Sequence, residues 1–503
     1  MLISGEITAQ QRLAQIQSLA QQGRFKQALG LIKSAPPPEQ TGLKAMHIGL
    51  LKAGQYYDEL LAIRAAEVTV APTSVISHHN MASALGDAGR TVEAEACARK
   101  ALSLGGKAPE TWIVLARALQ AQNRTDEAIS TYAEAISRRP DYVEAITEQA
   151  QLLWMSGRSE AEARAPFEKA LVVNPASSGL LQALGVFNLY VGMAPREVWQ
   201  DLTQRLDRAK LSTVETEVAA VNLAIEFDPA IALAHAQRAT EIDPSSVISW
   251  TNMAKAQLVA GHYAEASEIL AGLVQVVPQD QTVLALHAAT MRQLGRPDPL
   301  GLDDAEGLIW AMQIDVPEGW ESLDVYLYDL ARALETQHGY SRHPIGQSLR
   351  QGSQTPIDLR RVDDPVIQSF FTAIDRPIRE HLKRLGLGKD PVRSRNTGDY
   401  RLQGCWSVRL KSGGFHEAHI HGQGWLSSAC YIELPPAVDR GGQEGWMGFG
   451  VPPFSQMAPL EPLKVERPEP GKLVLFPSCM WHGTLPFDDE RHRLTIAFDI
   501  VPE

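Results

Sequence analysis

The sequence predicts a chain of two parts, an all-α solenoid of helical repeats followed by an all-β sandwich or barrel with flanking helices. Three observations lead to this prediction. A turn signal recurs at a nearly constant spacing between residues 23 and 296. That period disappears near residue 305, and from Tyr400 onward short apolar or alternating runs are separated by Gly, Pro and Asp. With 503 residues, the chain is also too long for one ordinary domain.

The turn signal is Gly-Arg or a close equivalent. It occurs at Gly23-Arg24, Gly54-Gln55, Gly89-Arg90, Asn123-Arg124, Gly157-Arg158, Gly261-His262 and Gly295-Arg296. Most gaps between these turns are about 34 residues or a multiple of that length. Leu, Ala and Ile recur at spacings of three and four between them, which is the apolar stripe of a helix packed against its neighbours.

A second series of residues, in phase with the first, marks where the second helix of a unit ends. It consists of Pro140, Pro175, Pro244 and Pro278. Proline at such a position stops a helix without breaking one. Together these features resemble the tetratricopeptide repeat, a helix-turn-helix unit, with about eight units between residues 8 and 300. We therefore expect residues 1–303 to form the solenoid and residues 304–503 to form the second domain.

One part of the repeat region departs from the pattern. Around residues 192–230 the segment VGMAPREVWQDLTQRL lacks the Gly-Arg turn, so one or two degenerate or irregular repeats are expected there. The array is either a scaffold or dimerisation arm, or it captures an extended peptide on a concave surface. We favour capture, which makes a peptide or protein the expected partner. The sequence does not define the oligomeric state.

Composition argues against several other classes of protein. The chain is 44% hydrophobic and 21% charged, as in soluble globular proteins, and its net charge of −12 disfavours a nucleic-acid partner. No apolar run reaches the roughly 18 residues of a membrane span, and MLISGEITAQQRLAQIQ has no basic segment before an apolar core. The four cysteines form no CxxC motif, which favours a reducing compartment. We expect a cytoplasmic protein without a membrane partner.

The second domain begins with two predicted helices, LDVYLYDLARALETQ and DPVIQSFFTAIDRPIREHLKRLG. Short runs with turn signals between them then predict strands. These runs are CWSVRLKSG, WLSSACYIELP, GWMGFGVP, KLVLFPS and RLTIAFDIVP. Many short strands of this kind are typical of a β-sandwich or barrel.

Three of the fourteen histidines lie within the six residues His416-Glu-Ala-His-Ile-His421. If this segment is a strand, His419 and His421 point to one face while His416 is out of phase. Two imidazoles at positions i and i+2 on one barrel wall can bind the same metal ion. The carboxylates of Glu417 and Glu433 are also candidates to approach that ion.

A further ligand is expected from a distant strand. His482 is the best candidate, because it lies where the strand of PGKLVLFPSCMWHG runs into a turn. Three protein ligands on one side of an ion leave positions open for substrate. Arg493, eleven residues later on the final predicted strand, offers a guanidinium group that can bind a carboxylate.

This order of residues resembles the Fe(II)/2-oxoglutarate-dependent oxygenases, whose core is a double-stranded β-helix of the jelly-roll type. The resemblance is carried by SLRQGSQT, WSVRLKSGGFHEAHIHGQGWLSSACYIELP, RPEPGKLVLFPSCMWHGTLPF and RLTIAFDIVP. These blocks, within residues 340–503, are similar to bacterial and phage members of the family that often follow tetratricopeptide repeats. The resemblance implies Fe(II) and 2-oxoglutarate as cofactors.

Residue by residue, the resemblance makes His419 the first iron ligand and His482 the distal one. It makes Arg493 the residue that binds the far carboxylate of 2-oxoglutarate, with Thr495 on the same strand as a helper. Tyr431, an aromatic neighbour of these motifs, is a further candidate for cofactor binding. His421 stands where the family has Asp or Glu. The site therefore either has three histidine ligands or takes a carboxylate from elsewhere, such as that of Glu417.

The resemblance implies an iron dioxygenase that hydroxylates a peptide or protein substrate presented by the repeats. One rival is a three-histidine oxygenase that does not use 2-oxoglutarate and is similar to the thiol dioxygenases, in which Arg493 holds a substrate carboxylate. A second rival is a binding protein in which the repeats act and the barrel is catalytically inactive.

Overall fold

The computed structural model describes residues 8–503 and divides them into two compact units. The first unit contains the described residues up to Thr131, together with Asn396–Gln403 and Ile500–Glu503. The second contains Tyr132–Arg395 and Gly404–Asp499. The domain boundary expected at residues 303 and 304 stays a prediction; the last repeat helix ends at Gln293 and the first strand begins at Trp310.

The first unit is built from the N-terminal repeat helices. They are α1 (Ala9–Gln21), α2 (Phe25–Lys33), α3 (Pro37–Gly42), α4 (Lys44–Ala53), α5 (Tyr57–Val70), α6 (Val75–Asp87), α7 (Thr91–Ser103), α8 (Pro109–Ala121) and the start of α9 (Thr125–Arg138). Residues 396–403 and 500–503 pack on them. The Gln55 amide donates to the Gln403 carbonyl oxygen at 2.7 Å, and Lys26 lies 3.2 Å from the carboxylate of Glu503.

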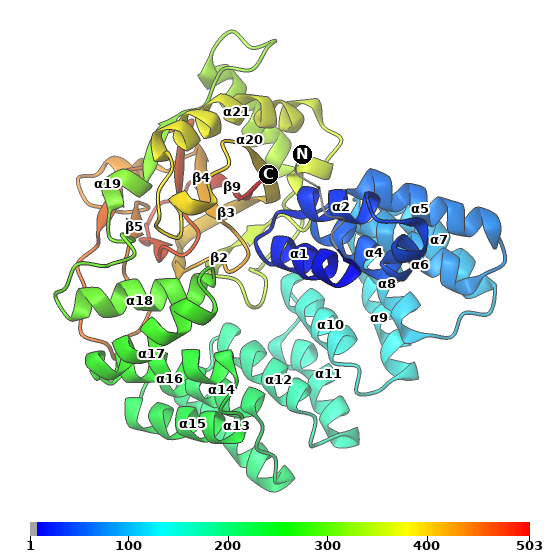
Figure 1. Cartoon of the computed structure of the whole chain (residues 1–503), viewed down its shortest axis with the longest axis horizontal. Helices are drawn as coiled ribbons and strands as arrows, with labels where there is room; N and C mark the ends of the chain where they lie inside the picture. Colours follow the sequence, from blue (N-terminus) through cyan, green and yellow to red (C-terminus); the bar gives the residue numbers. More distant parts are fainter. Residues whose placement is uncertain (1–7) are drawn as a thin grey trace, which may run out of the picture. The chain divides into compact units, whose positions relative to one another are not determined.

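The repeat helices continue through the second unit as stacked hairpins (Figure 1). They are α10 (Val143–Met155), α11 (Glu160–Val173), α12 (Ser178–Tyr190), α13 (Pro195–Ala209), α14 (Val214–Ala224), α15 (Pro229–Ile242), α16 (Val247–Val259), α17 (Tyr263–Val276) and α18 (Gln281–Gln293). The region predicted to be irregular still folds into helices α13 and α14. Lys210, the residue that caps the C-terminal end of α13, adopts the left-handed conformation at φ 51°.

The turn and proline signals have the expected structural roles. Gly89, Gly157 and Gly261 adopt φ values of 78°, 88° and 82°, which a residue without a Cβ accepts most easily. At the Gly54-Gln55 turn the left-handed residue is Gln55, at φ 59°, so that turn is shifted by one position from the prediction. Helices α9, α11, α15 and α17 each end two residues before Pro140, Pro175, Pro244 and Pro278 respectively.

The second domain contains the predicted helices and strands. Its helices are α19 (Ala305–Leu308), α20 (Leu323–Glu335) and α21 (Pro365–Leu385), with single turns η1 (Leu359–Arg361), η2 (Arg393–Arg395) and η3 (Pro436–Asp439). Its strands are β1 (Trp310–Gln313), β2 (Leu349–Gln354), β3 (Tyr400–His419), β4 (Leu426–Glu433), β5 (Met447–Phe449), β6 (Lys464–Glu466), β7 (Lys472–Pro477), β8 (His482–Thr484) and β9 (Arg493–Pro502).

These strands form one curled antiparallel sheet in the order β1-β7-β4-β9-β3-β8-β5-β6, with β2 paired to β3 off this path. Strand β3 joins the two halves. Near Ser407 it lies beside β9, because the Ser407 hydroxyl donates to the Thr495 carbonyl oxygen at 3.0 Å. Near its end, His416 and His419 pair with β8. Strands β4, β7 and β9 lie in one half and β5, β6 and β8 in the other, so the chain crosses repeatedly between the halves, as in a jelly roll, and the predicted fold class is confirmed.

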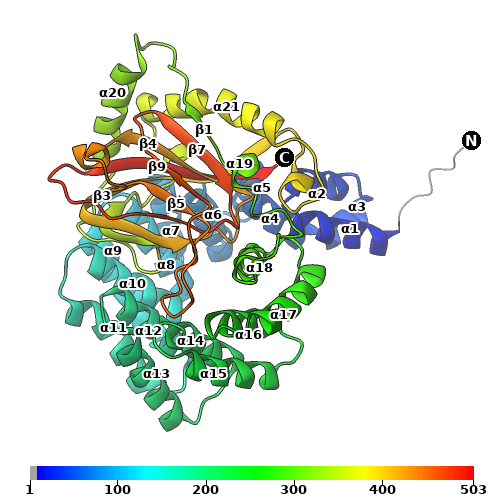
Figure 2. The same ribbon diagram turned by 90° about the vertical axis from the view of Figure 1, so that its left-hand side faces the viewer.

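Helices α20 and α21 lie against β4, β7 and β1 and cover one half of the sheet (Figure 2). Pro377 lies inside α21, where it cannot donate the usual hydrogen bond to the carbonyl of Ala373. The Asp315 amide donates to that carbonyl instead, at 3.0 Å, which connects the helix to the segment after β1.

Two repeat helices of the second unit, α10 and α18, contact segments of the second domain. In α10, the Trp154 indole donates to the His343 carbonyl oxygen at 3.0 Å. In α18, Arg292 donates to the carbonyl oxygen of Gly450, and the Trp481 indole donates to that of Ala285 at 3.3 Å. In these repeats, therefore, part of the helix surface is occupied by segments of the chain's own second domain.

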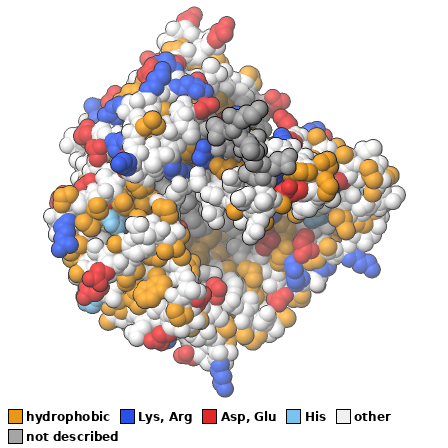
Figure 3. All heavy atoms as spheres, in the orientation of Figure 1, with side chains coloured by type: hydrophobic (Ala, Val, Ile, Leu, Met, Phe, Trp, Pro, Cys, Tyr) orange, Lys and Arg blue, Asp and Glu red, His pale blue; other side chains and the backbone are white. Residues whose placement is uncertain are grey.

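The charge of the surface and the length of the helices can be compared with what a nucleic-acid or membrane partner requires. On the face drawn in Figure 3, Lys and Arg side chains are interspersed with Asp and Glu, and the described residues form no continuous basic stripe there. A phosphate backbone would need such a stripe. No helix within residues 8–503 is long and apolar enough to span a bilayer.

Candidate metal centre

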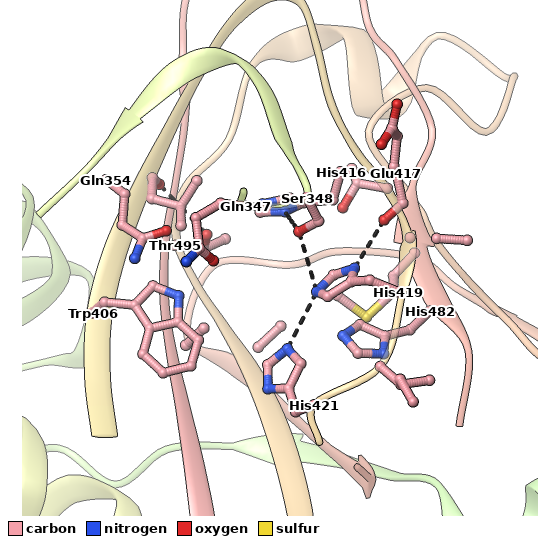
Figure 4. Close-up of a pocket in the computed structure, with 18 of the residues that line it drawn as sticks. Gln347, Ser348, Gln354, Trp406, His416, Glu417, His419, His421, His482 and Thr495 are labelled. Atoms are coloured by element: carbon pink, nitrogen blue, oxygen red, sulfur yellow. Dashed lines mark hydrogen bonds between the residues drawn. The ribbon is translucent and has the colours of Figure 1, made fainter. Parts of the chain in front are cut away.

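The structure brings the side chains of His419, His421 and His482 together (Figure 4). His419 is the last residue of β3 and lies opposite His482, the first residue of β8, in the strand register. Their ring centroids are 4.2 Å apart, and the His421 ring lies 5.1 Å from each. One nitrogen from each of the three imidazoles lies within 4.8 Å of the others.

Each of the three imidazoles is anchored through its Nδ1 atom. Nδ1 of His419 lies 2.8 Å from the Glu417 carbonyl oxygen, and Nδ1 of His482 lies 2.9 Å from that of Met480. Nδ1 of His421 lies 2.6 Å from a carboxylate oxygen of Asp499. Since these oxygens only accept hydrogen bonds, Nδ1 carries the proton and Nε2 carries a lone pair. This arrangement prepares Nε2 for a metal ion.

The spacing of the imidazoles also fits a metal ion. The Nε2 atoms of His419 and His421 are 3.2 Å apart, although neither carries a proton to share. Two nitrogens bound to one ion at roughly 2.1 Å lie about 3 Å apart. Burial, and then the neighbouring His421, lowers the pKa of His419 to about 4, and burial lowers the pKa of His482 well below its usual value. The uncharged imidazole is the form that binds metals.

The path of the chain around these histidines differs from the predicted regular strand. The register of β3 against β8 shifts between His416 and His419, and β3 ends at His419, two residues before His421. His421 is placed by a hydrogen bond from its amide to the Ser478 carbonyl oxygen at 2.9 Å. His416, although out of phase, lines the same cavity, and the Ser348 hydroxyl lies 3.0 Å from its Nδ1.

The two carboxylates considered as alternative ligands lie outside this group of imidazoles. Glu417 pairs with Arg350 at 2.6 Å, and in Figure 4 its carboxylate points away from the three rings. Glu433 lies in a second group of possible metal ligands, 3.6 Å from His492 Nε2, which is 3.5 Å from Glu335. Both carboxylates are therefore engaged elsewhere.

Asp499 is a site residue that the sequence analysis missed. Its carboxylate accepts hydrogen bonds from His421 Nδ1 at 2.6 Å and from the Ser427 hydroxyl at 2.7 Å. Asp499 thereby orients the His421 ring. It also places a negative charge directly behind one of the three imidazoles. The signal in the sequence was an acidic residue inside the apolar strand RLTIAFDIVP, although nothing there identified its partner.

Arg493 and Thr495 line the same cavity as the histidines. The Arg493 side chain is almost fully buried, at 1% exposure, and burial lowers its pKa. Its Nε and Nη2 atoms find no hydrogen-bond partner among the described residues, and its guanidinium lies 5.0 Å from the centre of the Tyr431 ring. Burying a charge with unsatisfied donors is costly, so this arrangement favours an anionic ligand.

The cavity has a volume of about 740 Å³, which is large enough for a small acid and part of a larger substrate. Trp406, Gln347 and Gln354 line one side of it (Figure 4). The Trp406 ring lies 5.8 Å from that of His421, and the Phe476 ring packs 4.5 Å from that of His482. Tyr190, at the end of repeat helix α12, also lines the cavity.

The fold and the cavity together define the class of protein: a helical repeat solenoid joined to a jelly-roll domain with an enzyme-like cavity. Residues 404–499 match a family model described as "Putative 2OG-Fe(II) oxygenase". Residues 113–179 and 223–290 match two models of the tetratricopeptide repeat. The chain thus combines tetratricopeptide repeats with a domain of this oxygenase family, and the resemblance seen in its motifs is confirmed.

Comparison with curated proteins gave no match. Among solved structures, the chain is similar to "Crystal structure of MamA" (17% identity, TM-score 0.26, covering 31% of this chain and 92% of that one). It is also similar to the "APC/C hetero-tetramer Cut9-Hcn1" (14%, 0.29, 57% of each chain). A third is a prolyl-4-hydroxylase from Pseudomonas putida (16%, 0.27, 41% of this chain and 98% of that one). With TM-scores this low, these likenesses carry no argument about function.

Proposed function

We propose that the protein is an Fe(II)- and 2-oxoglutarate-dependent dioxygenase that hydroxylates a peptide or protein substrate. One observation carries the proposal. Three imidazoles, each anchored through Nδ1, converge in a cavity that also contains a buried arginine with two unsatisfied nitrogen atoms. A divalent metal ion satisfies the imidazole lone pairs, and an acid satisfies the guanidinium. The match of residues 404–499 to the oxygenase family supports this pairing of cofactors.

In this proposal, His419, His421 and His482 hold Fe(II). Arg493 binds the far carboxylate of 2-oxoglutarate, and Thr495, two residues along β9, supplies a hydroxyl beside it. The buried Tyr431 ring lies next to the guanidinium and supports it. When bound, the iron would activate O2, with one oxygen atom going into succinate as 2-oxoglutarate is oxidatively decarboxylated with loss of CO2, and the other hydroxylating the substrate.

The remaining residues orient the ligands and exclude water. Three neutral imidazoles leave the ion's charge uncompensated among its direct ligands, and the Asp499 carboxylate behind His421 offsets part of that charge. Trp406 and Phe476 place apolar surface beside the imidazoles. Such surface lowers the local dielectric and strengthens the interactions of Arg493 with an acid.

The repeats supply the expected partner interaction. Tetratricopeptide repeats bind peptides and proteins in many settings, so a peptide or protein substrate remains our proposal. In the second unit, Tyr190 of α12 reaches the cavity that holds the histidines. A substrate that enters this cavity therefore contacts both parts of the chain.

The proposal is tested by adding Fe(II) to the metal-free protein without oxygen, followed by 2-oxoglutarate. We expect a visible charge-transfer band from the chelated 2-oxo acid. Arg493→Ala should require much more 2-oxoglutarate for the same band, whereas Arg440→Ala, at an exposed arginine paired with Asp489, serves as the matched control. Tight iron binding without any band would refute the use of 2-oxoglutarate.

A three-histidine oxygenase that does not use 2-oxoglutarate is the second candidate. The observation that favours it is the lack of a carboxylate among the grouped ligands, since Glu417 is paired with Arg350. Arg493 would then bind a carboxylate of the substrate itself. Iron binding with oxygen uptake independent of 2-oxoglutarate would support this candidate. No iron binding at all would support a barrel that is inactive.

A further inference from the structure

The strand that carries His419 contains a bulge next to the candidate metal centre. His416 pairs with Thr484 and His419 pairs with His482, so β3 has one more residue than β8 between these pairs. A Cβ at Gly483 would meet the His416 carbonyl oxygen at 2.9 Å and the Ala418 Cα at 3.1 Å, so a glycine is needed where β8 passes the bulge. Bulges next to functional sites re-aim the chain.

The bulge determines how His419 is held. It directs the Glu417 carbonyl oxygen toward His419 Nδ1, from which it accepts a hydrogen bond at 2.8 Å. The amide of Glu417 donates to the Ser348 carbonyl oxygen at 2.9 Å, which connects the bulge to the segment before β2. A change in the orientation of the Glu417 peptide would therefore release the ring that presents Nε2 to the metal.

The Glu417 side chain is held from the outside by Arg350 of β2. Arg350 Nη2 donates to the Glu417 carboxylate at 2.6 Å. The arginine side chain is 18% exposed and the glutamate side chain is 47% exposed. An exposed ion pair of this kind contributes little unless another group fixes its geometry.

Two kinds of contact fix the Arg350 guanidinium: its Nη1 donates to the carbonyl oxygens of Gln347 and Leu349 at 2.7 and 3.0 Å, and the repeats add an aromatic face. The Arg350 guanidinium carbon lies 4.3 Å from the centre of the Tyr190 ring, at the C-terminal end of α12. The backbone of Tyr190 is in turn fixed by His343, whose Nε2 lies 3.3 Å from the Tyr190 carbonyl oxygen. A guanidinium that lies over an aromatic face is attracted by the ring, and the contact excludes water from that side of the guanidinium.

We propose that Tyr190 is a positioning residue for the metal centre, acting through Arg350 and the Glu417 bulge on His419. The proposal rests on the metal-binding part of the proposed function and extends it, because it assigns to the repeats a role in shaping the centre itself. The oxygenase domain would then need the repeats for its metal affinity as well as for substrate capture.

The test uses the full chain and Co(II), whose affinity and visible d–d bands report the ligand geometry without any turnover. We expect Tyr190→Ala to weaken Co(II) binding about 3- to 10-fold and to alter the d–d bands, less than the roughly 10- to 100-fold of a direct partner of a ligand. Tyr190→Phe keeps the ring and should bind as the wild type does. Tyr142→Ala, which removes the ring 3.3 Å from Arg139, is the matched control in the same solenoid.

Two further variants separate the chain of contacts from a general loss of structure. Tyr190→Leu keeps apolar bulk without an aromatic face, so it should weaken Co(II) binding as Tyr190→Ala does. It serves as the test in place of Tyr190→Ala when the alanine variant folds poorly. Arg350→Ala should have a similar effect, and the double variant should be no weaker than Arg350→Ala alone, because both changes break one chain of contacts. Wild-type affinity and bands in Tyr190→Leu, or additive losses, would overturn the proposal. Failure of the wild type to bind Co(II) would instead overturn the metal centre.

Discussion

The chain contains two groups of possible metal ligands, and their differences are instructive. His419, His421 and His482 each have Nδ1 fixed by an acceptor, and His482 is buried at 4% exposure. In the second group, Glu335, Glu433 and His492 have side chains that are 45%, 42% and 27% exposed. The second group can be explained as an imidazole between two carboxylates at the surface. Burial and fixed tautomers, more than the clustering of ligand types, therefore distinguish a candidate metal centre.

The largest effect should separate the two groups directly. His482→Ala removes one of three converging lone pairs and should reduce Co(II) or Fe(II) affinity by more than the roughly 100-fold seen for outer partners. His492→Ala removes a histidine from the second group and should leave that affinity unchanged. Isothermal titration of the metal-free proteins gives both values. Equal losses in the two variants would mean that the second group also binds metal.

A smaller but selective effect is expected at the buried arginine. Arg493→Ala should leave Co(II) affinity within about twofold, because the guanidinium does not touch the imidazoles' anchoring atoms. It should raise the 2-oxoglutarate concentration needed for half-maximal signal by about 10-fold or more, since a charged hydrogen bond contributes about 1.5–3 kcal/mol. Titration of 2-oxoglutarate into the anaerobic Fe(II) protein measures this. An unchanged requirement would remove Arg493 from the acid site.

A substitution at Asp499 tests whether the carboxylate behind His421 contributes to metal binding by His419, His421 and His482. Asp499→Asn keeps the shape but removes the charge, and it can present its amide to His421 and disturb the tautomer. We expect Co(II) affinity to fall about 10-fold. Asp488→Asn, at an exposed residue that accepts a hydrogen bond from Ser412, is the control. Equal affinities in the two variants would show that the His421 anchor is dispensable.

The smallest effect is expected in the second group. Glu335→Gln removes one exposed carboxylate near His492, so the free energy of unfolding should change by about 0.5 kcal/mol or less. Urea unfolding of the two proteins side by side measures the difference. A larger loss in metal-containing buffer, abolished by a chelator, would instead give the second group a metal of its own.

The features that could be predicted from the sequence are those with local signals. The repeat turns, the prolines after the second helices and the strand runs all have short-range causes, and the structure follows them with a one-residue shift at Gln55. His419, His421 and His482 could be selected because their spacing is local or their flanking motif is distinctive. Their convergence is a geometric fact of the fold, while their role as iron ligands stays a prediction.

The features that the sequence did not reveal depend on contacts between distant segments. Asp499 reaches His421 across 78 positions, and Tyr190 reaches Arg350 only when α12 and β2 are brought together. The bulge at Glu417 brings His416 to the same cavity although strand alternation placed it out of phase, and Ser478 holds the backbone of His421 beyond the end of β3. In each case, pairing between strands or packing of a helix overrides the local pattern.

Strand β9 has a consequence for how the protein is made. It lies between β4 and β3 near the middle of the sheet, although it follows all the other strands along the chain, and it carries Arg493, Thr495 and Asp499. On the ribosome, the three histidines emerge before this strand. A nascent or truncated polypeptide that lacks β9 has the three histidines but lacks Asp499, which anchors His421, and the buried Arg493. An unfinished chain therefore presents the histidines before the groups that orient His421 and bind an acid are in place.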